Sequence, residues 1–178
     1  MKYCKNKLYE ILSNMYDDIA KEVKFDWCTS HSRSEELNKI YENIKSYRNE
    51  DFIPQRITQL SCDYVSHNGH IVIEYDEIQH FTIQRQLALE AYPKELQLLY
   101  DKDMWIKLCK EYQRSMNKRK DPMRDEKRAF YDSIRDILIP KNGYSLIRIY
   151  HGQIDFDGKN AVSDLKRILN RKYGIKNR

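Results

Sequence analysis

The dipeptide Asn68-Gly69 lies between two short runs of β-type residues and constrains this chain more than any other local feature. A type I′ turn needs a positive φ at both of its central residues, and Asn-Gly meets this requirement well. We therefore predict a β-hairpin over residues 63–77 with a two-residue loop. The loop also sets the register of the two strands, and it places Asp63 directly opposite Glu74.

Three acidic side chains share one face of this predicted hairpin. Side chains alternate between faces along a strand, so Glu74 and Asp76 are expected on the same face as Asp63. Like charges directly opposed, with Cβ atoms roughly 4.5–5.5 Å apart, destabilise a sheet. A hard divalent cation binds carboxylate oxygens and removes this repulsion. The spacing is equally consistent with a solvent-facing strand whose acids point at water.

The residues Gln79, His80 and Phe81 follow the second strand of the hairpin and favour the metal interpretation. An imidazole titrates near neutral pH, so a histidine beside a metal-binding carboxylate can act as a general acid or base. A single histidine in such a place is more often structural, and other parts of the sequence must decide between the two roles.

The rest of the chain predicts a mixed α/β domain with one sheet. Apolar spacing predicts a first helix over residues 5–24, followed by a loop over residues 26–33. Ser34 is a good N-cap for a second helix. The other predicted elements are strands at 53–60, 63–66, 71–77 and 144–150, helices in 84–120 interrupted by Pro93, and helices at 125–139 and 162–173.

The charge distribution points to a polyanionic partner. The net charge is +5 and the sequence pI is about 8.9. The basic residues of the first cluster are Arg114, Lys118, Arg119, Lys120, Arg124, Lys127 and Arg128, and a second cluster occupies residues 166–178. One such cluster would usually be a solvated helix face. Two clusters in a chain of 178 residues favour a surface that contacts phosphates.

Other features exclude several classes of protein. The four cysteines are scattered and form no C-x-x-C pair, so a zinc ribbon is not expected. No apolar run approaches membrane-spanning length, and the residues after Met1 lack the apolar segment of a secretory signal. We therefore expect a single-domain protein of the cytoplasm without membrane contact.

Four segments, which form three matches, resemble the PD-(D/E)XK nuclease superfamily. Residues 73–81, Ile-Glu-Tyr-Asp-Glu-Ile-Gln-His-Phe, are similar to its "IEyDGxQHF" signature, most of all in the branch of very-short-patch repair endonucleases and phage homing endonucleases. Residues 125–131 and 143–150 resemble the "D..K..y…gy.LiRI.y" block of that branch, and residues 34–37 resemble the start of its first core helix. The three matches follow the order of the family.

This resemblance implies a restriction-endonuclease-like core of order α-β-β-β-α-β over residues 34–150, within one nuclease domain. Residues 1–30 would form an N-terminal helical extension, 84–120 a helical insertion and 151–178 a C-terminal helix. The extra first helix would cover the sheet, form a homodimer contact or lie against DNA.

The resemblance also implies roles for individual residues. Asp63 and Glu74 would bind Mg²⁺ or Mn²⁺, and Asp76 stands where the superfamily usually has a lysine. His80 would be the catalytic histidine, and Asp125 the acid that orients it.

For three further residues, the resemblance suggests a role in catalysis without a match to one of the principal catalytic positions. Glu36 matches the acid of the first core helix. Lys127 or Arg148 would offset negative charge on the phosphate in the transition state. A solvated helix residue and a strand-end ion pair are slightly more common roles for such a lysine and arginine.

The expected function is that of a metal-dependent endonuclease, which hydrolyses DNA phosphodiester bonds and leaves 5′-phosphate ends. The missing lysine at position 76 motivates an alternative, a non-catalytic nucleic-acid-binding protein on a degenerate nuclease fold. A second alternative is a small α/β protein whose acidic cluster is structural.

Overall fold

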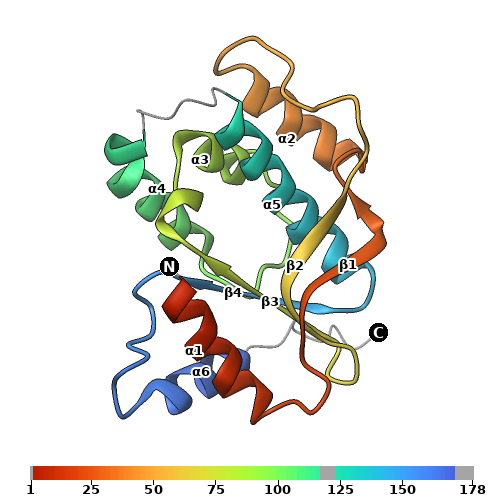
Figure 1. The fold of residues 1–178 in the computed structure, drawn as a ribbon. Helices are drawn as coiled ribbons and strands as arrows, with labels where there is room; N and C mark the ends of the chain where they lie inside the picture. The colour runs from red at the N-terminus through yellow and green to blue at the C-terminus, as the bar shows by residue number, and fades with distance from the viewer. Residues whose placement is uncertain (1, 117–122, 171–178) are drawn as a thin grey trace.

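The computed structural model describes residues 2–116 and 123–170, and it contains a four-stranded mixed sheet (Figure 1). The strands are β1 (Ala20–Thr29), β2 (Gln59–Ser66), β3 (Ile71–Asp76) and β4 (Ser145–Tyr150), in the spatial order β1-β2-β3-β4. The first three strands are antiparallel, and β4 runs parallel to β3. The prediction of a mixed α/β protein with one sheet is confirmed.

Helices cover both faces of this sheet (Figure 1). The helices on one face are α2 (Glu35–Lys45), α3 (Ile83–Glu90), α4 (Lys102–Met116) and α5 (Arg124–Lys141), and those on the other are α1 (Lys2–Ser13) and α6 (Ala161–Leu169). Alternate residues of each inner strand therefore enter different cores. Val72 packs in the core beneath α5, whereas Ile73 packs in the core beneath α1 and α6. Every residue of β3 is buried for this reason.

The predicted register of the hairpin is confirmed, because Tyr64 pairs with Ile73 in β3. The predicted turn type is wrong. Within this turn the positive φ falls on His70, at 47°, and not on Asn68 or Gly69. Side-chain oxygens accept hydrogen bonds from the amide groups of both central residues. These bonds hold the turn in its observed conformation.

The prediction for the N-terminal region is wrong in part. The helix expected over residues 5–24 ends halfway as α1, and β1 replaces both its second half and the loop expected over 26–33. Val23, Phe25 and Trp27 alternate as strand residues do, and pairing of β1 with β2 gives this alternation its hydrogen-bond partners. Helix α1 covers the sheet with Leu8 and Leu12, which are fully buried. This is the first of the three roles considered for it.

The remaining elements largely follow the sequence. The hydroxyl of Ser34 accepts a hydrogen bond from the amide of Leu37, as expected of an N-cap. Helices α3 and α4 lie on either side of Pro93. The strand expected at 53–60 is wrong over most of its length, since β2 begins only at Gln59. None of the described helices is long and apolar enough to cross a membrane.

Candidate active site

Strands β2 and β3 separate at Asp63 and Glu74, as the diverging ribbons show (Figure 1). Their pairing is confined to residues 64–66 and 71–73, although both strands continue further. Hydrogen bonds from the backbone to side chains take the place of the backbone pairing that is missing here. Glu74 Oε1 accepts a hydrogen bond from the Asp63 amide at 3.1 Å, and Asp63 Oδ2 accepts one from the Tyr75 amide at 3.0 Å. The fork thus places two carboxylates against the backbone of the sheet.

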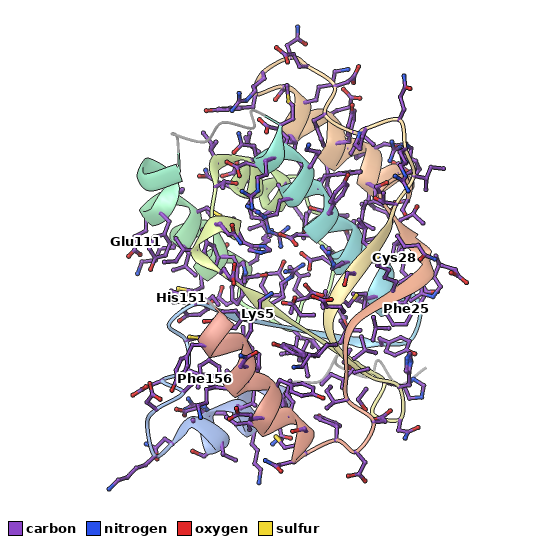
Figure 2. The ribbon with its side chains drawn as sticks, in the orientation of Figure 1. Lys5, Phe25, Cys28, Glu111, His151 and Phe156 are labelled. Carbon is purple, nitrogen blue, oxygen red and sulfur yellow. The ribbon has the colours of Figure 1, made fainter. Side chains whose placement is uncertain are left out.

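Cations from opposite faces of the sheet reach these two acids. Lys5 of α1 donates to both carboxylate oxygens of Asp63, at 2.8 and 2.9 Å, and Figure 2 labels it where α1 meets the sheet. Arg135 of α5 lies 3.7 Å from Glu74 Oε1. Glu74 and Asp76 share one side of the sheet, as expected, because Glu74 pairs with Arg135 of α5 and Asp76 shares Arg148 with Asp136 of α5. Asp63 departs from the expectation, because the strands part and its carboxylate pairs with Lys5 of α1.

Glu74 occupies an environment that disfavours its charge. It is only 5 % exposed. Burial raises the pKa of its carboxyl to about 7, while the guanidinium of Arg135 opposes this rise. Burial therefore shifts the titration of Glu74 from the acidic range towards neutral pH in the protein without a bound cation.

A second group of side chains meets beside the end of β3. Asp76 is the last residue of β3, His80 ends the short 3-10 helix η1 (Ile78–His80), and Asp132 lies in the middle of α5. His80 Nδ1 is 2.9 Å from Asp132 Oδ2 and 3.7 Å from Asp76 Oδ1. One potential ligand atom from each residue lies within 4.8 Å of the others. This Asp76–His80–Asp132 cluster is the candidate catalytic centre.

Asp132 takes the place that the sequence assigned to Asp125, so that assignment is wrong. Asp125 lies 3.6 Å from Arg128 in the first turn of α5. The helix carries two D-x-x-R units seven residues apart, Asp125 to Arg128 and Asp132 to Arg135. Seven residues are about two helical turns, so both units lie on the same side of α5. Of the two units, only the second has its aspartate, Asp132, in contact with His80.

Arg135 was missed by the sequence reasoning and joins the two parts of the site. Its Nε and Nη2 atoms donate to the backbone oxygen of Ser61 in β2, at 3.0 and 2.7 Å. Its Nη1 atom donates to Asp132 Oδ1 at 3.2 Å. Arg135 therefore ties the fork at Glu74 to the cluster. The repeated D-x-x-R spacing was the signal in the sequence that would have drawn attention to it.

Arg148 neutralises the cluster from inside the protein. Its Nη1 and Nε atoms lie 2.6 Å from Asp76 and 2.6 Å from Asp136, respectively. Arg148 is 1 % exposed, so the expectation that it contacts DNA is wrong. Burial raises the pKa of Asp132, but His80 and Arg148 outweigh this effect and hold that pKa well below its usual range. Asp132 is consequently an anion.

A cavity of about 520 Å³ opens over His80 and Asp132. Its lining residues are Pro54, His80, Arg124, Lys127, Arg128, Tyr131, Asp132 and Arg135. Three of the predicted nucleic-acid-binding residues thus surround the cluster. Arg128 is held there by a 2.8 Å hydrogen bond to the backbone oxygen of Gln79. The side chain of Arg114 and the residues Lys118, Arg119 and Lys120 lie outside the described part of the chain.

Glu36 lies apart from this site. It pairs with Lys141 at 2.9 Å, and that lysine is nine residues beyond Asp132 on α5, about 13 Å along the helix axis. A hydrogen bond with Ser34 and the pairing with Lys141 lower the pKa of Glu36 to about 2. The expected catalytic role is wrong, because α2 packs beside α3 and α5 and carries Glu36 away from His80.

The donor set of the cluster fits a divalent cation. Carboxylate oxygens suit Mg²⁺ and Mn²⁺, and Mn²⁺ also accepts an imidazole. The buried carboxylates at the cluster and the fork are Glu74, Asp76, Asp132 and Asp136, and the guanidinium groups paired with them are Arg85, Arg135 and Arg148. One negative charge stays uncompensated when Glu74 is ionised, and a bound cation would offset it.

Comparisons of the chain with family models, with curated proteins and with solved structures found no match. A function can therefore be proposed only from the residues of the site and their geometry. The relevant facts are a carboxylate–imidazole cluster, a fork with two further acids, and a cavity with a basic rim.

Proposed function

We propose that this protein is a metal-dependent endonuclease that hydrolyses DNA phosphodiester bonds and leaves 5′-phosphate ends. The observation that carries this proposal is that His80 and Asp132 line the same cavity as Arg124, Lys127 and Arg128. An imidazole held by a carboxylate supplies acid–base chemistry. The neighbouring cations attract a phosphodiester. Phosphodiester hydrolysis needs both in one place.

The order of the elements supports a restriction-endonuclease-like core. Helix α1, strands β1 to β3, helix α5 and strand β4 follow one another in the order α-β-β-β-α-β, if α2, α3 and α4 are counted as insertions. In this assignment α1 is the first core helix instead of the helix that begins after Ser34. The core then starts at the N-terminus and not at residue 34.

His80 is the residue that moves a proton. Asp132 is an anion and accepts the hydrogen bond at Nδ1, so the neutral imidazole carries its proton on Nδ1. Its Nε2 atom then holds the lone pair that can take a proton from an attacking water. Asp132 selects this tautomer and stabilises the imidazolium that forms.

With His80 assigned to proton transfer, Asp76 and Asp132 are the residues that would hold Mg²⁺ or Mn²⁺. When bound, such an ion polarises a phosphate oxygen and lowers the pKa of water. Arg148 donates to Asp76 and fixes the orientation of its carboxylate. Arg124, Lys127 and the rest of the basic rim bind the phosphate and place it over His80.

Cleavage of supercoiled plasmid and of a 5′-labelled oligonucleotide tests this proposal, with Mn²⁺, Mg²⁺ or EDTA. The variant His80→Ala should lose metal-dependent cutting, while His70→Ala, which removes an exposed histidine of the hairpin turn, should keep it. Ligation of the products without prior phosphorylation shows whether they carry 5′-phosphates. Equal cleavage by both variants would refute the assignment of His80.

A second candidate is a nucleic-acid-binding protein without catalysis. The observation in its favour is that Lys5 already neutralises Asp63 and Arg148 already neutralises Asp76, so neither acid requires a metal. This candidate predicts DNA binding that is unchanged by EDTA and no cleavage with either metal. The same plasmid assay, combined with a gel-shift measurement in EDTA, separates the two candidates.

A further inference from the structure

The cavity over the cluster has an apolar wall beside its basic rim. Tyr131 and Pro54 line it together with Arg124, Lys127 and Arg128. Tyr131 is partly buried and packs against the larger of the two cores, which restricts the motion of its ring. The ring is thus a fixed surface. Base stacking on such a ring is tolerant of sequence, since every nucleobase has a π face.

The two groups of the cluster that line this cavity, His80 and Asp132, are largely buried. The side chain of His80 is 18 % exposed and that of Asp132 is 1 % exposed. A phosphate in an uninterrupted duplex lies on the convex outside of the helix, with its base stacked inside. A nucleotide that leaves the stack can instead bring both its phosphate and its base into the cavity.

The size of the cavity agrees with this arrangement. Its volume of about 520 Å³ lies within the roughly 300–1,000 Å³ typical of small-molecule sites. A phosphate alone would leave the Tyr131 wall without a contact. A nucleotide places its phosphate at the cations and its base at the tyrosine.

We propose that the cavity receives one whole unstacked nucleotide, with its phosphate against Arg124, Lys127 and Arg128 and its base against Tyr131. This inference deepens the nuclease function and rests on it for its biological meaning. The preferred substrate class is then DNA with a single-stranded or frayed segment, such as an overhang, and not uninterrupted duplex. Tyr131 is a binding residue that acts on the base, and it takes no part in proton transfer.

Fluorescence of 2-aminopurine deoxyriboside 5′-monophosphate, which is quenched on stacking, tests the site directly in EDTA. We expect this nucleotide to bind at least about tenfold more tightly than inorganic phosphate or the 2-aminopurine deoxyriboside, because only the nucleotide engages both walls. Equal affinity of the nucleotide and inorganic phosphate would overturn the proposal.

Substitutions at Tyr131 separate stacking from folding. Tyr131→Phe keeps the ring and should retain both quenching and affinity, whereas Tyr131→Ala should lose the quenching and bind the nucleotide about tenfold more weakly. Tyr47→Ala removes a tyrosine that is 43 % exposed on the surface and should change neither. Indistinguishable affinity and quenching in the alanine and phenylalanine variants would also overturn the proposal.

The outcomes distinguish this inference from the nuclease function on which it rests. Nucleotide binding that depends on Tyr131, without cleavage of any DNA, would support the nucleotide site and reject the nuclease. Metal-dependent cleavage at equal rates on blunt duplex and on overhangs, together with no preference for the nucleotide over phosphate, would support the nuclease and reject the nucleotide site.

Discussion

Asp132 Oδ2 lies 2.9 Å from His80 Nδ1, although 52 residues separate the two in the chain. Asp132→Asn keeps the shape of this contact but removes the negative charge that selects the tautomer of His80 and that would help to hold the metal ion. We expect the cleavage rate to fall by about 10²–10⁴-fold. Asp125→Asn is the matched control from the first D-x-x-R unit of α5 and should stay within a few-fold of wild type. Circular dichroism establishes that both variants are folded. The reverse order of the two rates would contradict the role of Asp132.

Arg148 is predicted to stabilise the fold and not to bind DNA. Arg148→Met leaves Asp76 buried without its arginine and leaves Asp136 with Arg85 alone. This should lower the free energy of unfolding by about 3–5 kcal/mol. Arg167→Met breaks an ion pair whose arginine is 78 % exposed, so a change of no more than about 1 kcal/mol is expected. Urea denaturation measures both effects. A stable Arg148→Met protein with weakened DNA affinity would show that the residue serves at the surface after all.

Glu74 should make the protein less stable as the pH rises. Its folded pKa of about 7 lies above the model value of 4.5. Its contribution is therefore fully present below pH 4.5 and declines as the pH rises through 7, by about 3 kcal/mol in all. Glu74→Gln should remove this decline when unfolding is measured in EDTA between pH 5 and 8.5.

Glu36→Gln is the matched control for this pH dependence. Glu36 has a pKa of about 2, so it does not titrate between pH 5 and 8.5 and the slope should stay as in wild type. An unchanged slope in Glu74→Gln would mean that Glu74 is ionised throughout this range.

The cysteines should differ sharply in their reactivity. Burial raises the pKa of Cys28 to about 11 and that of Cys109 to about 12, and it moves the pKa of Cys62 in the same direction. Cys4 is partly exposed. A thiol reagent that gives a coloured product should therefore label Cys4 rapidly at pH 8 and the other three only on unfolding. Cys4→Ser should abolish the fast phase, and a fast phase that persists would show that one of the buried thiols is accessible.

Local patterns were sufficient for much of the fold. The hairpin register followed from alternation and a short turn, and the helix after Ser34 followed from its cap. Strand β1 was missed because Ile19 and Val23 also fit a helical spacing, and only the pairing of β1 with β2 decides between the two patterns. The turn type was wrong for a similar reason, since side chains that bond to the turn amides set its conformation.

By itself, the sequence determined that Glu74 and Asp76 lie on the second strand of a hairpin and that His80 follows this strand, because alternation and turn formation depend on neighbouring residues. Only the tertiary structure decided which acid meets His80. Asp125 and Asp132 have the same local sequence pattern and lie on the same side of α5. The position of α5 along its own axis, relative to the sheet, places Asp132 and not Asp125 next to His80. The separation of β2 from β3 was likewise decided by the tertiary structure. It leaves the amide groups of Asp63 and Tyr75 without strand partners, and the carboxylates of Glu74 and Asp63 accept their hydrogen bonds. In this arrangement Asp63 also pairs with Lys5.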